Sequence, residues 1–316
     1  MLRASELTKR YSSTLALDRL SLDVPAGAVF GLLGPNGSGK TTFLKLVMGF
    51  IFPDAGRIDR GGLSTSRIGY MSEHAFYPTR FAVRDYLTTL GRLGGTAASP
   101  LAGISVGPAY STAGSNAIRG EIDRLLAQLG LDEFAERRLG ALSRGTLQRV
   151  GLAQVLLGNP DLILLDEPVL GLDPAAQKFM RDQIAALHLA GKTIFLCSHN
   201  LDEVTRVCTH VAVLKQGMLV RAGPLPEMLG ARSQIIIATG SLPAELAPCL
   251  VALSSGITVG DGQVTLNDEA RAYKAQALRL LLDASVDIQR LDERQTSLEE
   301  IYLKVTDSAQ FPGRES

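Results

Sequence analysis

The run GPNGSGKTT, from Gly34 to Thr42, is the most informative stretch of this chain. It follows the apolar run VFGLL and precedes the helix-like stretch FLKLVMGF, so a strand, a glycine-rich loop and a helix are expected in that order. The run satisfies the pattern G-x-x-x-x-G-K-[ST], in which glycines let successive backbone N–H groups point at one anion. The start of the helix adds the positive end of its dipole. The sequence therefore predicts a loop that binds the phosphates of a nucleotide.

The side chains of this loop have separate expected tasks. Lys40 is expected to reach the β- and γ-phosphates of ATP as a point charge, and the Thr41 hydroxyl is expected to hold Mg²⁺. An ordinary glycine-rich turn is the alternative, which the flanking strand and helix disfavour. The residues expected to contact the nucleotide are Gly34, Pro35, Asn36, Gly37, Ser38, Gly39, Lys40, Thr41 and Thr42.

The composition is that of a globular protein without net charge. With 316 residues and 46% hydrophobic side chains, the chain is long enough for about two domains with their own cores. Lys and Arg together number 32, as do Asp and Glu, so no electrostatic argument favours a nucleic-acid partner. The three cysteines lack the spacing of a metal site, and no apolar signal segment opens the sequence. A cytoplasmic location is expected.

Buried parallel strands are predicted downstream of the loop. The runs DLILLDEP, 161–168, and KTIFLCSH, 192–199, are apolar without alternation, as in a sheet covered by helices on both faces. Between them a helix is predicted over 174–189, with Asp173 as N-cap and proline at the first helical position. A hairpin is predicted to turn at residues 216–217. The predicted fold class is therefore α/β.

Hydrolysis of ATP needs a further metal ligand and a group that orients water, and strand ends are where these belong. Asp166 and Glu167 close one predicted strand, which makes Asp166 a candidate Mg²⁺ ligand and Glu167 a candidate base. His199 follows the next strand at the same edge, where a contact with the γ-phosphate is expected. The alternatives are an acid pair that caps a neighbouring helix and a buried, hydrogen-bonded histidine.

Two other stretches complete the organisation. Residues 93–118 carry no charge and are rich in Gly, Ser and Ala, so they are interpreted as a flexible loop rather than a membrane span. From 231 the pattern changes to a strand, SQIIIATG, a hairpin turning at residues 261–262, and an amphipathic helix, EARAYKAQALRLLLDA. This predicts a small α+β domain over 231–306, followed by a disordered polar tail over 307–316.

With these residues in hand, the chain resembles the ATP-binding subunit of an ABC transporter over about residues 2–230. The further marks are LSRGTLQR at 142–149, similar to the LSGGQ signature of that family, then LLDEP, GLDP at 171–174 and SHNLDEV from Ser198. The resemblance implies a P-loop NTPase cassette over 1–230 with a RecA-like core and an antiparallel β part. It also implies a helical subdomain over about 74–160, with 93–118 as an insertion.

The resemblance also implies roles for residues outside the loop. Two such cassettes sandwich two ATP molecules, and Ser143 and Gly145 match signature positions that bind the nucleotide of the other subunit. Tyr11 matches the aromatic residue that stacks on adenine, and Asp173 matches the residue that communicates between the two sites. Taken alone, Ser143 and Asp173 are ordinary helix caps, and a lone Tyr11 is more often a packing residue.

Two departures from the family pattern bear on activity. Glu73 stands where the family usually has Gln that touches Mg²⁺ and senses the membrane partner; Glu remains a metal and nucleotide-site ligand but adds negative charge. Arg144 and Thr146 replace the usual Gly and Gln of the signature, which weakens the expectation of activity but not of binding.

The details of the motifs, with the C-terminal domain ending in SLEEIYLKVT, are similar to cassettes paired with ABC-2 type permeases, which are mostly exporters. The implied protein is an ATPase peripheral to the cytoplasmic face of the membrane, with ATP and Mg²⁺, a permease and a second, identical cassette as partners, and no nucleic acid. Insertion 93–118 is expected to contact the permease or to be inert. Two alternatives are a soluble ABC ATPase acting on ribosomes or DNA and a nucleotide switch that scarcely hydrolyses ATP.

Overall fold

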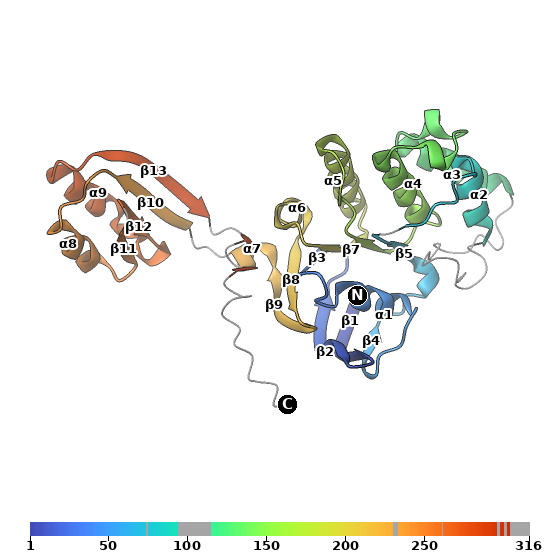
Figure 1. Ribbon diagram of the computed structural model, residues 1–316, viewed down its shortest axis with the longest axis horizontal. Helices are drawn as coiled ribbons and strands as arrows, with labels where there is room; N and C mark the ends of the chain where they lie inside the picture. The colour runs from blue at the N-terminus through green and yellow to red at the C-terminus, as the bar shows by residue number, and fades with distance from the viewer. Residues whose placement is uncertain are drawn as a thin grey trace. The chain divides into compact units, whose positions relative to one another are not determined.

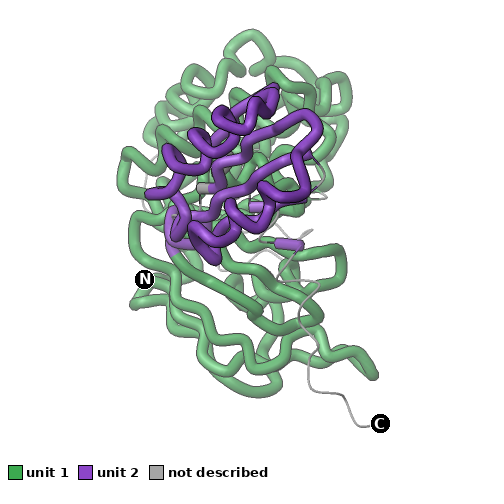
Figure 2. Tube along the Cα trace, turned by 90° about the vertical axis from the view of Figure 1, so that its left-hand side faces the viewer, with its two compact units in different colours: residues 1–223 green, residues 224–316 purple. Residues whose placement is uncertain are grey.

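A computed structural model describes residues 1–73, 75–93, 115–229, 233–260, 262–295, 298–299 and 302–303. The chain forms two compact units, Met1–Gly223 and Pro224–Ser316, coloured separately in Figure 2. The division falls a few residues before the domain boundary expected at 230. Each unit is described by itself.

The first unit is built on a six-stranded sheet with the order β5-β6-β7-β3-β8-β9. The pairs β5/β6, β6/β7, β7/β3 and β3/β8 are parallel, as the unbroken apolar runs predict. β3, which leads into the glycine-rich loop, is a central strand. The strands are β3 (Val29–Leu33), β5 (Ile68–Met71), β6 (Leu162–Asp166), β7 (Thr193–Ser198), β8 (His210–Lys215) and β9 (Met218–Pro224).

A second, antiparallel sheet has the order β2-β1-β4. Together with helix α1 (Lys40–Met48) it lies on one side of the parallel sheet (Figure 1). Its strands are β1 (Leu2–Tyr11), β2 (Thr14–Val24) and β4 (Ala55–Asp59). Buried side chains of β1, β2, α1 and one face of the parallel sheet form a single apolar core, which includes Leu7, Leu20, Phe43 and Phe195. This core fixes α1, and hence the loop before it, against the parallel sheet.

Helices cover the other face of the parallel sheet (Figure 1). α4 (Arg144–Leu156) contacts β5, α5 (Pro174–Leu189) contacts β7, and α6 (Leu201–Val207) contacts β3 and β7. α2 (Val83–Leu93) and α3 (Ser115–Gln128) pack on α4 and on each other, between β5 and β6 in the sequence. Short 3-10 turns lie at Thr65–Arg67, Asp132–Phe134 and Leu139–Ala141.

The predicted loop 93–118 is wrong at both of its ends. α2 continues through Leu93, and α3 begins at Ser115, so the predicted flexible ends are helical. The reason is packing, because Ile118 and Ile122 lie one turn apart on α3 and are both buried. Because residues 93–118 carry no charged side chains, the sequence pattern does not separate this apolar helix face from a polar one. Residues 94–114 of the insertion lie outside the described residues.

Two local predictions are confirmed. The helix between the two buried strands runs over Pro174–Leu189, and the Asp173 Oδ1 atom accepts a hydrogen bond from the Ala176 N–H at 2.8 Å. The hairpin β8–β9 turns at Gln216 and Gly217, whose φ values of 49° and 82° suit the two central positions of a type I′ turn.

The second unit contains a four-stranded antiparallel sheet with the order β11-β12-β10-β13. The chain order is strand, helix, strand, strand, helix, strand, which together with this sheet order is the split βαβ arrangement of ferredoxin-like folds. Ile235, Ile237, Leu250 and Leu281 belong to its core. The elements are α7 (Leu225–Leu229), β10 (Ser233–Thr239), α8 (Leu246–Leu253), β11 (Ile257–Gly260), β12 (Gln263–Leu266), α9 (Lys274–Asp283) and β13 (Ile288–Gln295).

The hairpin expected near residues 261–262 is confirmed by the antiparallel pairing of β11 with β12. The amphipathic helix expected from Glu269 is only partly correct, because Asp268–Tyr273 is a 3-10 helix capped by Asn267 and the α-helix begins at Lys274. The tail 307–316 lies outside the described residues.

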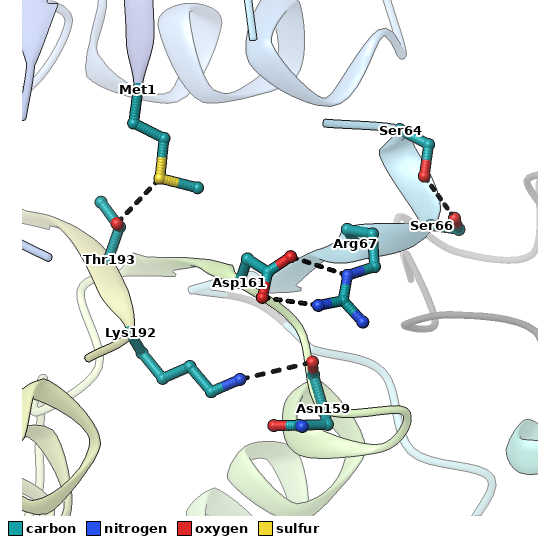
Figure 3. A network of polar contacts seen from close by, with 8 residues as sticks. All are labelled: Met1, Ser64, Ser66, Arg67, Asn159, Asp161, Lys192 and Thr193. Atoms are coloured by element: carbon teal, nitrogen blue, oxygen red, sulfur yellow. Dashed lines mark hydrogen bonds and ion pairs between the residues drawn. The ribbon is translucent and has the colours of Figure 1, made fainter. Parts of the chain in front are cut away.

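Polar contacts tie together the amino ends of the parallel strands (Figure 3). Arg67, just before β5, donates two hydrogen bonds of 2.7 and 2.6 Å to Asp161, just before β6. At the start of β7, Lys192 Nζ donates to the Asn159 carbonyl at 3.4 Å and Thr193 Oγ1 lies 2.9 Å from Met1 Sδ. These contacts hold the edge of the sheet opposite the glycine-rich loop.

A buried hydrogen bond joins α2 to α4. Tyr86 Oη donates to Gln154 Oε1 at 2.7 Å, and both residues are buried. Tyr86→Phe should lower the free energy of unfolding by about 1–3 kcal/mol, because the Gln154 amide is left buried without this donor. Urea denaturation measures it. Tyr77→Phe is the control: its hydroxyl makes no hydrogen bond within the described residues, so a change below about 0.5 kcal/mol is expected. Equal losses in both variants would contradict the prediction.

Candidate nucleotide site

The carboxyl ends of three parallel strands bring the candidate residues to one edge of the sheet. In the strand pairing Cys197 of β7 lies between Leu32 of β3 and Asp166 of β6. The Glu167 N–H extends the ladder by donating to the Cys197 carbonyl at 3.0 Å. The residues that follow these strands are the loop 34–42, Glu167 and His199, so the sequence prediction of a shared edge is confirmed.

The loop is held by its own backbone and by neighbouring strands. Gly34 leaves no room for a side chain, since a Cβ there would lie 2.3 Å from the Leu214 carbonyl oxygen. Gly39 has a φ of 108°, and a Cβ there would lie 2.5 Å from the Ala16 carbonyl oxygen. The Gly217 N–H donates to the Ser38 carbonyl at 3.0 Å. The fixed backbone is what close approach to a phosphate requires.

The buried Lys40 side chain folds back over this loop. Its Nζ atom donates to the Gly34 carbonyl at 2.6 Å and lies 3.3 Å from the Pro35 carbonyl. The ammonium group is therefore held inside the glycine-rich loop, beside the carboxyl end of β3. These contacts use two of its three N–H donors, which leaves one for a phosphate oxygen.

Thr41 and Asp166 form a pair of oxygen groups beside Lys40. Thr41 Oγ1 donates to Asp166 Oδ2 at 3.0 Å, and Asp166 is only 2% exposed. Burial raises the pKa of Asp166 to about 6, the Thr41 hydrogen bond opposes this, and the charges of Glu167 and Glu73 add to it. A hydroxyl and a buried carboxylate are the kind of ligands that Mg²⁺ prefers.

Glu167 is held in an unusual conformation. Its φ of 49° lies in the left-handed region, which non-glycine residues rarely adopt and which is common at functional sites. Its buried carboxylate lies 2.9 Å from His199 Nδ1 and 3.5 Å from Ser198 Oγ. His199 is about half exposed, so one side of its ring reaches solvent. The alternative of a helix-capping acid pair does not fit these contacts, and Ser198 was not foreseen from the sequence.

Tyr11 and Glu73 lie at two other places around the loop. Tyr11 ends β1 and is 43% exposed, with Lys9 Nζ 5.8 Å from its ring centroid. The β1–β2 hairpin that contains Tyr11 also contacts the loop, because the Ala16 carbonyl of β2 packs against Gly39. Glu73 follows β5 on the exposed surface, and its charge acts on Asp166.

Ser143, Gly145 and Asp173 form a separate cluster at the starts of two helices. Ser143 Oγ accepts from the Thr146 N–H at 3.2 Å and caps α4, as Asp173 caps α5. A Cβ at Gly145 would lie 3.3 Å from the Ala176 Cβ, so the two helix starts are adjacent. No hydrogen bond or ion pair among the described residues joins this cluster to the loop 34–42.

One buried group is left unsatisfied inside the loop. Ser38 Oγ is buried and has no hydrogen-bond partner within the described part of the chain. An unpaired buried hydroxyl costs about 1–3 kcal/mol, so a ligand oxygen at this point would remove a penalty. The loop geometry, the Lys40 ammonium and the Thr41–Asp166 pair thus fit a nucleoside triphosphate with Mg²⁺.

A parallel α/β sheet whose central strand runs into this loop and helix defines a P-loop nucleoside triphosphatase. A family model described as ABC transporter matches residues 17–170. An ABC transporter ATP-binding protein of Nostoc sp. is 39% identical over 244 residues, which cover 72% of this chain and 68% of that protein. The chain belongs to the ATP-binding subunits of ABC transporters, and it is an ATPase.

Further relatives extend the match. The Nod factor export ATP-binding protein I of Burkholderia thailandensis is 30% identical over 312 residues, 95% of both chains. The crystal structure of a nucleotide-free ATP-binding cassette from an ABC transporter superposes with a TM-score of 0.61 at 25% identity, covering 72% of this chain and 92% of that one. No helix within the described ranges has the length and apolar character needed to cross a membrane.

Proposed function

We propose that this chain powers export through an ABC-2 type permease. The observation that carries the proposal is the similarity to the Nod factor export ATP-binding protein of B. thailandensis, because it extends over 95% of both chains and so includes the C-terminal unit. Cassette-only similarity would favour no direction of transport. The alternative of a ribosome- or DNA-directed ATPase finds no support in a chain of zero net charge.

The loop and the strand ends would divide the work of hydrolysis. Lys40 and the loop N–H groups hold the phosphates of ATP, and Tyr11 stacks on adenine. Glu167 acts as the base that accepts a proton from the attacking water, since it lies at the strand end beside the loop. His199 is oriented by its 2.9 Å contact with Glu167 and is placed at the γ-phosphate. Lys40 and Glu167 are buried, which strengthens the electrostatic contacts that these two side chains make.

Thr41 and Asp166 are the residues that would hold Mg²⁺, with Glu73 as a further ligand. Their 3.0 Å contact already places two oxygen ligands side by side. When bound, the ion neutralises the charge on the phosphate oxygens. The raised pKa of Asp166 does not prevent ligation, because the carboxylate is the form that prevails above a pH of about 6.

A second, identical cassette would complete the site. Ser143 and Gly145 stand at the positive end of α4 and are placed at the γ-phosphate of the nucleotide bound by the partner. Asp173 caps the adjacent helix and reaches the same interface. The two caps present one surface, which supports pairing through it.

Exposed aromatic side chains mark the surface proposed for the permease. Phe52 and Phe76 are 79% and 71% exposed, and Phe50 and Phe81 are also exposed. Phe50 lies edge-on to Tyr70 of β5 at a centroid distance of 6.0 Å, close to the strand end that leads to Glu73. Apolar groups that lie together on the surface are typical of interaction sites, and the proposal assigns these side chains to one such patch. A permease docked here would sit beside a residue whose charge acts on the Mg²⁺ ligand Asp166.

The test is capture of the tagged Glu167→Gln protein with Mg-ATP from detergent-solubilised native membranes, with partners identified by mass spectrometry. A stoichiometric polytopic membrane protein is expected, and Phe52→Ser should lower its yield at least about tenfold, as loss of a hot spot would. Leu189→Ser, at an 87% exposed residue of α5, is the control and should leave the yield unchanged. Ribosomal or DNA-repair partners without a permease would overturn the proposal.

A further inference from the structure

Arg144, the first residue of α4, packs against the loop that follows Glu167. Gly171 has a φ of 68°, and a Cβ there would lie 2.4 Å from Arg144 Nη1, 2.7 Å from Cζ and 3.0 Å from Nη2. The guanidinium group of Arg144 therefore occupies the space that a Cβ at Gly171 would need. The φ favours glycine at this position, and a side chain there would displace the Arg144 guanidinium.

Two more contacts join the same helix to the same segment. One turn beyond Arg144 on α4, Gln148 Nε2 donates to the Pro168 carbonyl at 2.7 Å. Gly145 packs against Ala176 in the first turn of α5. The segment from Pro168 to Ala176 is therefore held by α4 near its beginning, its middle and its end.

Arg144 makes no ion pair within the part of the chain that the structure describes. Among the described residues no carboxylate lies within ion-pair distance of Arg144, and the first turn of α4 has no acidic residue. A cation at a helix start opposes the helix dipole, so this residue does not serve the stability of α4. What the structure shows is its planar guanidinium group packed against Gly171, a contact that the compact ammonium group of lysine does not reproduce.

We propose that Arg144 is a positioning residue that couples Ser143 to Asp173 within one subunit. Its guanidinium fastens the Gly171 turn to α4, so that the two cap residues keep a fixed spacing on the surface offered to a second cassette. The proposal rests on the proposed pairing of cassettes. It adds that ATP-driven pairing weakens when Arg144 no longer couples these two residues.

The test compares Arg144→Met, Arg144→Lys and the unchanged chain. Met keeps the unbranched stem and the helix propensity but lacks the planar group. The concentration of protein that gives half-maximal ATPase activity should rise at least about fivefold in both variants, the low end of usual coupling strengths. The affinity of the single subunit for ATP and the midpoint of thermal unfolding should not change. An unchanged concentration dependence would overturn the proposal.

A double-mutant cycle isolates the contact. Gly171→Ala should weaken pairing more in the unchanged chain, where the methyl group displaces the guanidinium from its place against the turn, than in the Arg144→Met background, where only the backbone strain remains. Gly191→Ala is the matched control, with a similar φ of 79° and open space around its Cβ position. Equal effects of Gly171→Ala in both backgrounds would contradict a direct contact.

A further comparison separates this inference from the proposed function. Glu167→Gln should form an ATP-dependent dimer on size exclusion, and Glu167→Gln with Arg144→Met should need a higher protein concentration to do so. A Glu167→Gln protein that never pairs would overturn the proposed pairing itself. A pair that forms equally well with and without the Arg144→Met change would overturn only the role of Arg144.

Discussion

Glu167→Gln should lower the turnover of ATP at least about a hundredfold while leaving ATP binding intact. A positioned general base contributes about 10²–10⁴-fold to a rate, and Gln cannot accept the proton of the attacking water. The amide keeps the size of the carboxylate, so the loop and its Lys40 remain in place. Phosphate release at saturating Mg-ATP measures the rate, and equilibrium titration with a fluorescent ATP analogue measures binding.

Glu203→Gln is the control for this change. Glu203 is buried to the same extent, 6% exposed like Glu167, but it pairs with Arg181 at 2.6 Å and stands outside the site. We expect it to lower stability, since a buried partner is lost, and to leave the turnover of the folded protein near that of the unchanged chain. Equal turnover rates for Glu167→Gln and the unchanged chain would contradict the role of Glu167 as base. They would favour a nucleotide switch that scarcely hydrolyses ATP.

Asp166→Asn should make the nucleotide-free, metal-free protein more stable above pH 6 by about 2–3 kcal/mol, while abolishing turnover. The pKa of Asp166 is raised from 3.8 to about 6, chiefly by burial, so the folded protein holds this proton more tightly than the unfolded chain. As pH rises from about 4 to 6, the unfolded chain has already released the proton and the folded protein loses stability. Asn never carries the buried charge, yet its Oδ1 can still accept from Thr41.

The pH series supplies its own control. Urea unfolding of both proteins at pH 7.5 should show the largest difference, and the difference should vanish below about pH 4, where Asp166 is protonated in both states. A gain in stability that is the same at every pH would contradict the assigned cause. Added Mg-ATP should reverse the order at pH 7.5, because the unchanged chain gains binding energy that the variant lacks.

Buried parallel strands and the glycine-rich loop could be predicted because each leaves a local mark. An unbroken apolar run such as 162–165 is typical of a buried strand, and proline after Asp173 fixes the start of the helix at Pro174. The predicted edge of the sheet then follows from the parallel direction of the strands. It brings Thr41 and Asp166 within hydrogen-bond distance although 125 residues separate them.

What could not be predicted depends on register and packing. The contact of Ser198 with Glu167 requires knowing which residue of β7 lies beside the end of β6. The helical residues after 114 depend on burial of Ile118, which an uncharged stretch does not reveal. The contact of Arg144 with Gly171 joins a helix start to a loop with no motif linking them, so only the three-dimensional structure shows it.

The hydrogen bond from the Gly217 N–H to the Ser38 carbonyl also orients the peptide that follows it. In a planar trans peptide the N–H points opposite to the C=O, so with the Ser38 oxygen turned toward the β8–β9 turn, the Gly39 N–H points the other way. A tight turn late in the chain thereby sets the direction of a dipole within the loop. The electric field at this part of the loop is in place before any anion arrives, and no reorientation is needed on binding.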